Sequence, residues 1–292
     1  MVRCGATHVE GSRSRSEDPG ATPGASTIFL TVPFAVRIAA SALLASAWGC
    51  ASAPLVPSSV ALRPPVTPLP GAVSTVVIDA GHGGHDPGAS HFGLQEKHLA
   101  LDIAKRLAAR LEEAGLTVVM TRETDRFIPL SRRAGIANRA QADLFVSIHL
   151  NANPRGRVSG IEVYYPRGSV VSSQAPWPPS VYPSEVGIPT TAVKQVLWDL
   201  VLRETRAQSR ALASAVCRAM EGGLGSPCRT VKPARFVVLR EAWMPAVLVE
   251  VGYLSNGAEA QRLGSAEYRQ AAAATIAAGV IAYIRELGVQ HI

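Results

Sequence analysis

Apolar runs separated by polar, glycine-bearing turns form the dominant pattern of the chain from about residue 73 onward. Continuous apolar runs predict strands buried on both faces, and apolar residues four apart predict helices with one packed face. Strands are expected at 76–78, 116–120, 144–149, 160–165, 236–239 and 246–251, and helices at 99–111, 130–140, 193–220 and 266–287. Gly115 and the Gly222-Gly223 pair are predicted to end the first and third helices.

The order of these segments indicates the fold class. Strand, helix, strand, helix, strand at the start of the pattern is typical of an α/β sheet. Residues 73–292 are therefore expected to form a single α/β domain, and no internal repeat interrupts it. Residues 166–191 are proline-rich and irregular, and this insertion is longer than an ordinary connection.

The first 72 residues are expected to lie outside the core. Residues 1–50 begin with a polar stretch that predicts disorder, followed by an apolar run of signal-peptide length at 38–49. The run ends at Cys50 in a sequence that resembles a lipoprotein cleavage box, although Trp48 departs from the usual small residue. A membrane anchor or a buried helix is the alternative, and Val36 is an alternative start of the protein.

Residues 51–72 are rich in proline and predict a semi-extended tether. A signal, a tether and a domain together are the layout of an exported protein of the periplasm or cell envelope. The only membrane contact expected is a lipid on Cys50.

The composition allows a substantial core and several partners. Hydrophobic residues make up 47% of the chain and the net charge is +7, which suits nucleic acid, anionic envelope polymers or membrane surfaces. The basic residues are scattered without interleaved aromatics, so no nucleic-acid partner is expected. Cys217 and Cys228 form either a disulfide or two buried thiols, and their spacing is not that of metal ligands.

Four polar side chains stand where chemistry is expected. His82 and His149 end two predicted strands, Glu96 begins a predicted helix, and Glu250 interrupts an apolar strand. Two histidines and a carboxylate are the donor set of a catalytic zinc site. A buried carboxylate is costly without a partner, so Glu250 should face a metal, a cation or a cleft.

Each residue also has a structural interpretation. His82 suits a glycine-rich loop, His149 suits a core histidine with ordinary partners, and Glu96 suits the positive end of a helix dipole. His85 is a lesser candidate ligand, because it lies three residues after His82 and the glycine turn would bring it near the metal.

Four motifs occur in an order that resembles a known family. They are Ile78-Asp79-Ala80-Gly81-His82-Gly83-Gly84, Gly93-Leu94-Gln95-Glu96-Lys97, Ser147-Ile148-His149-Leu150-Asn151-Ala152 and the segment from Pro245 to Asn256. Together they resemble the zinc-dependent N-acetylmuramoyl-L-alanine amidases of bacterial cell-wall turnover. The resemblance implies a central, mostly parallel sheet flanked by helices, with peptidoglycan as the substrate.

The same resemblance implies roles for individual residues. His82, Glu96 and His149 match the zinc ligands, and Glu250 matches the catalytic glutamate. Arg122, Asn151 and Arg240 lie in or beside the motifs and are expected to hold substrate or brace the site.

Three alternatives remain open from the sequence. Some members of the family cover the metal with a segment placed like 166–191 until an activator protein removes it, whereas a surface loop or cleft wall is the plainer interpretation. The domain as a whole could be a peptidoglycan-binding module that lacks chemistry. It could also be a zinc peptidase that cuts another bond.

Overall fold

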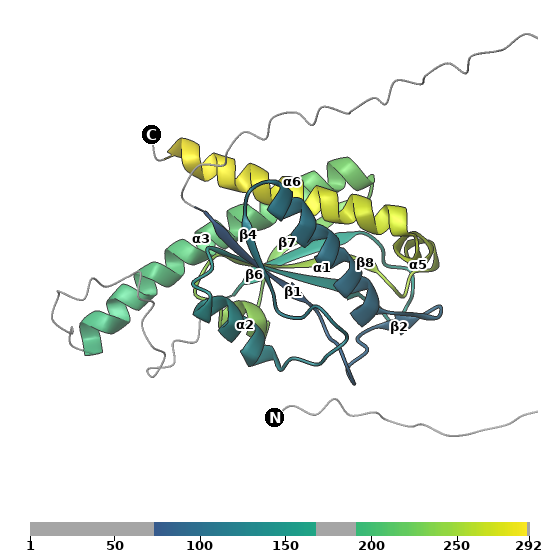
Figure 1. Ribbon diagram of the computed structural model, residues 1–292, viewed down its shortest axis with the longest axis horizontal. Coiled ribbons are helices and arrows are strands. Elements are labelled where there is room, and N and C mark those ends of the chain that lie inside the picture. The colour runs from purple at the N-terminus through teal and green to yellow at the C-terminus, as the bar shows by residue number, and fades with distance from the viewer. Residues whose placement is uncertain (1–72, 168–190, 291–292) are drawn as a thin grey trace, which may run out of the picture. The chain divides into compact units, whose positions relative to one another are not determined.

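One six-stranded sheet organises the residues that the computed structural model describes, 73–167 and 191–290 (Figure 1). The strands are β1 Thr75–Ala80, β4 Thr117–Met120, β5 Leu144–Asn151, β6 Ile161–Pro166, β7 Cys228–Ala234 and β8 Ala246–Tyr253, with a separate hairpin of β2 Ser90–His91 and β3 Leu94–Gln95. The helices are α1 Glu96–Glu113, α2 Leu130–Arg139, α3 Thr191–Leu224, α4 Val237–Arg240, α5 Gly257–Gly264 and α6 Ala266–Gln290.

The strand order creates a natural place for a site. The sheet runs β4-β1-β5-β8-β6-β7, and β4, β1, β5 and β8 are parallel to their neighbours. After β1 the chain moves outward to β4 and then returns across β1 to β5. In open α/β sheets, ligands bind outside the carboxyl ends of the strands at such a switch point. Strand β6 is antiparallel to β8, and β7 is parallel to β6. Both β6 and β7 therefore begin at the edge where the four parallel strands end.

Helices cover both faces of the sheet, which confirms the predicted fold class. Alternate residues of β1 face opposite sides: Val76 and Ile78 pack toward α1, α3 and α6, whereas Val77 packs toward α2 and α4. Figure 1 shows α6 above the fan of strands and α2 below it. Helix α6 is long and apolar enough to cross a membrane, but Ile276 and Val280 are fully buried in this core.

Two details of the predicted elements are wrong. Residues 236–239 form a helical turn, α4, which buries Val238 and Leu239 beneath the sheet. The strand in this region is β7, whose residues are mostly exposed or half-buried, because an edge strand is held by backbone pairing and needs no apolar run. Helix α3 continues through Gly222 and Gly223 and ends at Leu224.

The structure contains the Cys217–Cys228 disulfide, one of the two alternatives left open by the sequence. It joins the last turns of α3 to the first residue of β7. Residues 1–50, the tether at 51–72 and positions 168–190 of the predicted insertion lie outside the described residues.

Candidate active site

The four candidate residues come from strand ends and one helix start. His82 follows β1, His149 lies near the end of β5, Glu250 lies within β8, and Glu96 is the first residue of α1. Strands β5 and β8 are paired with His149 opposite Glu250. Paired residues of neighbouring strands point to the same face, so both side chains lie on the same side of the sheet.

His82, Glu96 and His149 converge on a single point. Glu96 Oε1 lies 3.1 Å from His82 Nε2 and 2.9 Å from His149 Nδ1. The ligand atoms of the three residues all lie within 4.8 Å of one another, and the two rings meet edge to face with centroids 5.0 Å apart. Two nitrogens and one oxygen are thus aimed at a common position.

Glu96 is held as an anion. Its Oε1 also accepts a hydrogen bond from the Leu150 amide, and its Oε2 accepts one from the Ala89 amide, each 2.9 Å long. Burial acts to raise the pKa of Glu96, but hydrogen bonds from His149 and His82 outweigh it and hold the pKa well below its usual value. A charged carboxylate is therefore available beneath the two imidazoles.

Asp86 orients the first histidine. Its Oδ2 lies 2.8 Å from His82 Nδ1, which leaves Nε2 directed toward Glu96. Burial acts to lower the pKa of His82, but the hydrogen bonds to Glu96 and Asp86 outweigh it and raise the pKa. A carboxylate behind a histidine is the usual second partner of a metal-bound imidazole. The sequence motifs do not include this role, although Asp86 lies only four residues after His82.

Glycines permit the close approach of these side chains. A Cβ on Gly81 would lie 2.4 Å from Cε1 of His149, and a Cβ on Gly88 would lie 2.5 Å from Oε2 of Glu96. His82 itself has a φ of 59°, a left-handed conformation that is uncommon outside glycine. The turn therefore needs support from its surroundings.

Two buried arginines supply that support. Arg133 donates to the carbonyl oxygens of Ala80 and His82, each at 2.6 Å. Arg122 donates to Gly81 O at 2.6 Å and to Ala80 O at 2.9 Å. Their combined hydrogen bonds fix three successive carbonyls of the turn that carries His82. Arg122 thus braces the site, as one of its two predicted roles required, and Arg133 is a second brace that the sequence did not indicate.

Glu250 differs from Glu96 in its partners. Its Oε2 is enclosed and has no hydrogen-bond partner within the described part of the chain. Burial raises the pKa of Glu250 well above its usual value, and the negative charges of Glu96 and Glu162 add to this effect. The surroundings of Glu250 thus favour its protonated form, whereas those of Glu96 favour the anion.

The other nearby candidates have different surroundings. The His85 ring packs on Phe127, with centroids 4.2 Å apart, and His85 is not part of the metal-competent group. Asn151 donates to Glu162, on the β6 side of Glu250. Arg240 has an enclosed Nε with no partner among the residues described.

The three converging residues fit a divalent metal ion. Ligand atoms about 2.0–2.1 Å from a tetrahedral Zn²⁺ are roughly 3.3 Å apart, close to the separations of Glu96 Oε1 from the two ring nitrogens. A His, Glu, His donor set also leaves a coordination position open. The donors alone suit several transition metals as well as zinc.

Comparisons with known proteins agree with this geometry. Residues 76–282 match the family model described as N-acetylmuramoyl-L-alanine amidase. The chain is 39% identical over 218 residues to N-acetylmuramoyl-L-alanine amidase AmiC of Neisseria meningitidis serogroup B, which covers 72% of this chain and 52% of that protein. It is 36% identical over 232 residues to amidase AmiA of Salmonella typhimurium, covering 75% and 79% of the two chains.

Solved structures give the same result. The amidase AmiC2 of Nostoc punctiforme superposes with a TM-score of 0.58 at 35% identity, over 73% of this chain and 97% of that one. The catalytic domain of the amidase CwlV superposes with a TM-score of 0.57 at 31% identity, over 72% and 98%. The match spans about half the length of the Neisseria relative and most of the Nostoc chain. The protein belongs to the N-acetylmuramoyl-L-alanine amidase family.

Proposed function

We propose that this protein hydrolyses the amide bond between the lactyl group of N-acetylmuramic acid and the L-alanine of peptidoglycan stem peptides, with Zn²⁺ as its cofactor. The observation that carries the proposal is the convergence of His82, Glu96 and His149 on one point with Glu250 in register beside them. Membership of the family supports the same reaction. A binding module would have no use for an enclosed carboxylate oxygen that has no hydrogen-bond partner among the described residues and lies beside a metal-competent site.

In this proposal His82 Nε2, Glu96 Oε1 and His149 Nδ1 hold the metal ion, and Asp86 keeps His82 in the required orientation. Bound Zn²⁺ would polarise the amide carbonyl and increase the acidity of the attacking water. Arg133 and Arg122 hold the turn that carries His82, so the imidazole nitrogen of His82 is already in position and the turn need not move during the reaction.

Glu250 is proposed as the group that moves the proton. Its carboxylate would accept a proton from the attacking water and deliver it to the nitrogen of L-alanine as the amide bond breaks. The enclosed Oε2, which has no hydrogen-bond partner among the described residues, is available for this transfer. Such general acid–base catalysis contributes about 10²–10⁴-fold in rate. The products would be a lactyl carboxylate on the glycan and a peptide with a free L-alanine amine.

We also propose that the protein acts outside the cytoplasmic membrane, in the periplasm or cell envelope, where its substrate lies. The apolar segment at 38–49, with or without lipid on Cys50, would direct export. Mass spectrometry of the mature amino terminus tests this. Processing at or just before Cys50 supports export, and an intact terminus from residue 1 contradicts it.

Control by an activator protein is a separate proposal, which concerns the insertion at 166–191. Its length and proline content support a role other than a simple connection. Deletion of 170–190 should raise basal hydrolysis if the insertion limits access to the site. Unchanged basal hydrolysis would leave the insertion as a surface loop or cleft wall.

Digestion of purified sacculi by the zinc-loaded protein tests the proposed reaction. We expect peptides that begin with a free L-alanine amine and glycan strands that end in unsubstituted lactyl carboxylates. Binding without release would indicate a binding module, and new ends within the peptide would indicate a peptidase. Glu250→Gln is the matched control, because it should bind zinc and sacculi while releasing little peptide.

A further inference from the structure

A second polar cluster lies beside Glu250, on the side away from the metal-competent residues. Glu162 of β6 is paired across the sheet with Glu250 of β8, just as His149 of β5 is paired on the other side. His149, Glu250 and Glu162 therefore form one row across three neighbouring strands. The row runs outward from the proposed metal to the edge formed by β6 and β7.

Glu162 is surrounded by side-chain donors. Only 7% of the residue is exposed, and its Oε2 accepts hydrogen bonds from the Tyr164 hydroxyl and, at 3.2 Å, from Asn151 Nδ2. Burial raises the pKa of Tyr253 to about 12, and the nearby Glu162 carboxylate adds to this effect. Lys232 Nζ lies 3.8 Å from Glu162 Oε2 and 5.0 Å from the centre of the Tyr164 ring. We call these five residues the Glu162 cluster.

The cluster fixes a cation at the rim of the site. The Lys232 side chain is 49% exposed, so its ammonium group meets solvent on the side away from Glu162. It is too far from the carboxylate for a direct hydrogen bond, which leaves its N–H groups available to a ligand. A buried anion and an aromatic face thus hold a lysine in a defined place.

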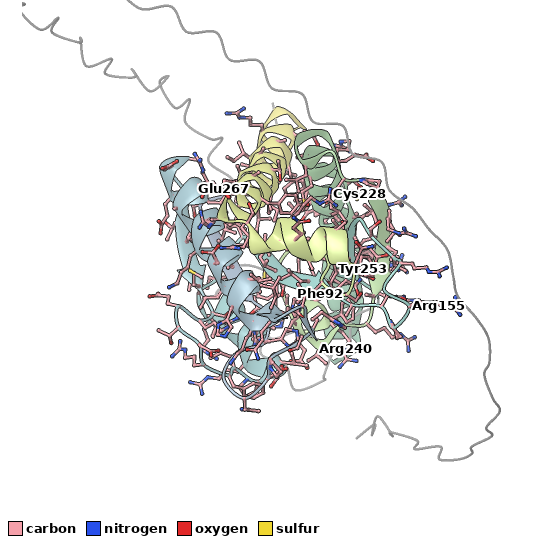
Figure 2. The ribbon with its side chains drawn as sticks, turned by 90° about the vertical axis from the view of Figure 1, so that its right-hand side faces the viewer. Phe92, Arg155, Cys228, Arg240, Tyr253 and Glu267 are labelled. Atoms are coloured by element: carbon pink, nitrogen blue, oxygen red, sulfur yellow. A yellow bond between two sulfur atoms is a disulfide. The ribbon has the colours of Figure 1, made fainter. Side chains whose placement is uncertain are left out.

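Further basic residues lie on β7 and on the connection between β5 and β6. Arg229 lies in the same strand, β7, and donates to Ser159 O at 3.1 Å, which ties it to the β5–β6 connection. That connection also carries Arg155 and Arg157, both exposed, and Figure 2 shows Arg155 at the outer border of the molecule with Tyr253 nearer the middle. Glu162 is the only acidic residue in the segments 151–167 and 228–240. Every exposed charged side chain of these two segments, which form the rim, is therefore basic.

The proposed reaction gives the substrate a direction. Glu250 would protonate the departing nitrogen, so the peptide lies on the Glu250 side of the scissile bond and the glycan on the side of the metal ligands. The strands that follow β8 on this side are β6 and β7. Stem peptides carry free carboxylates on the residues after L-alanine, which complement a positive rim.

We propose that Lys232 and Arg229, with Lys232 positioned by the Glu162 cluster, form the subsite that binds the carboxylates of the stem peptide. This inference rests on the proposed function and adds the orientation of the substrate and the groups that select it. Arg155 and Arg157 would extend the same attraction to longer peptides.

Kinetics with two soluble muramoyl peptides test the subsite. One peptide keeps its carboxylates beyond L-alanine and the other carries carboxamides in their place. The zinc-loaded wild-type protein should prefer the carboxylate form through a lower KM, and added salt should weaken that preference because the contacts are partly exposed. If the wild-type protein showed no preference for the carboxylate peptide, or a preference that salt did not change, this result alone would overturn the proposal.

Substitutions of the two basic residues provide a second test of the subsite. Arg229→Gln combined with Lys232→Met should raise KM for the carboxylate peptide about tenfold, the effect of two exposed ion pairs, with kcat and the carboxamide kinetics nearly unchanged. Lys232→Arg should keep most of the preference. Arg126→Gln, an exposed arginine on the β4 side, is the matched control and should change neither KM.

Three outcomes would overturn the subsite. These are equal losses on both peptides, an equal loss from the Arg126→Gln control, and retention of the preference by the double variant. Failure of the proposed function is a separate result, since the wild-type protein would then cleave neither peptide.

Discussion

The two sides of the candidate site treat buried negative charge in opposite ways. On the β1–β5 side, Glu96 accepts hydrogen bonds through both oxygens and its pKa is lowered. On the β8–β6 side, Glu250 has an enclosed oxygen with no hydrogen-bond partner among the described residues, it lies near the second carboxylate Glu162, and its pKa is raised. Burial acts to raise the pKa of both carboxylates, so burial alone does not decide their behaviour.

The different hydrogen bonding of Glu96 and Glu250 matches the different roles proposed for the two carboxylates. In the proposed site, the side chains that hold a metal ion must stay deprotonated and in place, and the contacts of Glu96 and Asp86 meet these requirements. A proton carrier needs both of its protonation states within reach, which the surroundings of Glu250 favour. The following predictions separate these two arrangements.

Glu96→Gln should have the largest effect. The amide cannot supply the charged ligand, so bound zinc should fall from about one ion per chain to nearly none and hydrolysis should fall to background. Metal analysis after gel filtration, together with release of peptide from sacculi, measures both. Full zinc content in this variant would exclude Glu96 as a ligand.

Glu250→Gln should lower kcat by about 10²–10⁴-fold while zinc content stays at the wild-type level. The protein should be at least as stable near neutral pH, because the substitution removes a carboxyl group whose ionisation in the unfolded chain opposes folding. Kinetics with a soluble muramoyl peptide and thermal unfolding check the two parts. A loss of zinc would mean that the roles of base and ligand are exchanged.

Asp86→Asn should weaken zinc binding by about 10–100-fold through its effect on His82, with activity largely restored by excess zinc. Titration with a competing chelator measures the affinity. If excess zinc restores nothing, Asp86 has a role beyond orienting the histidine.

The pH dependence of stability should distinguish the two sides in metal-free protein. The pKa of Glu96 is lowered by folding, so its stabilising contribution is present above about pH 4.5 and is lost as the pH falls. The pKa of Glu250 is raised by folding, so ionisation of the unfolded chain opposes folding increasingly as the pH rises above about 4.5.

Thermal unfolding between pH 4 and pH 8 measures this contrast. Glu250→Gln should gain stability relative to the wild type as the pH rises. The deficit of Glu96→Gln should shrink as the pH falls. Parallel curves for both variants would contradict the difference between the two carboxylates.

The disulfide should affect the site least. Replacement of Cys217 and Cys228 by serine should lower the free energy of unfolding by about 2–3 kcal/mol, as expected for a short closed loop, and leave kcat nearly unchanged. Denaturant unfolding and peptide kinetics test the two parts. A large loss of kcat would show that β7 depends on this bond for its position.

The sequence predicted those parts of the fold and site that depend on local pattern. Apolar runs revealed β1, β5 and β8, and the residues that interrupt or follow them, such as His149 and Glu250, lie in the site. Strand β7 was not predicted, because this edge strand is held by backbone pairing with β6 and its side chains do not form an apolar run.

Residues that act through distant partners were harder to find. Arg133 lies on a helix and contacts a turn about 50 positions earlier, which no local pattern reveals. Glu162 did carry a signal, because it interrupts an apolar strand in the same way as Glu250. An acid within a buried strand is therefore worth examining wherever it occurs in this chain.

X-ray absorption at the zinc edge of the loaded protein examines the metal site directly. The structure predicts two imidazole nitrogens at about 2.0–2.1 Å together with oxygen ligands, and a spectrum that Glu250→Gln leaves unchanged. Sulfur or a third imidazole among the ligands, or a shell that changes in Glu250→Gln, would contradict the assignment of His82, Glu96 and His149 as the residues that hold the ion.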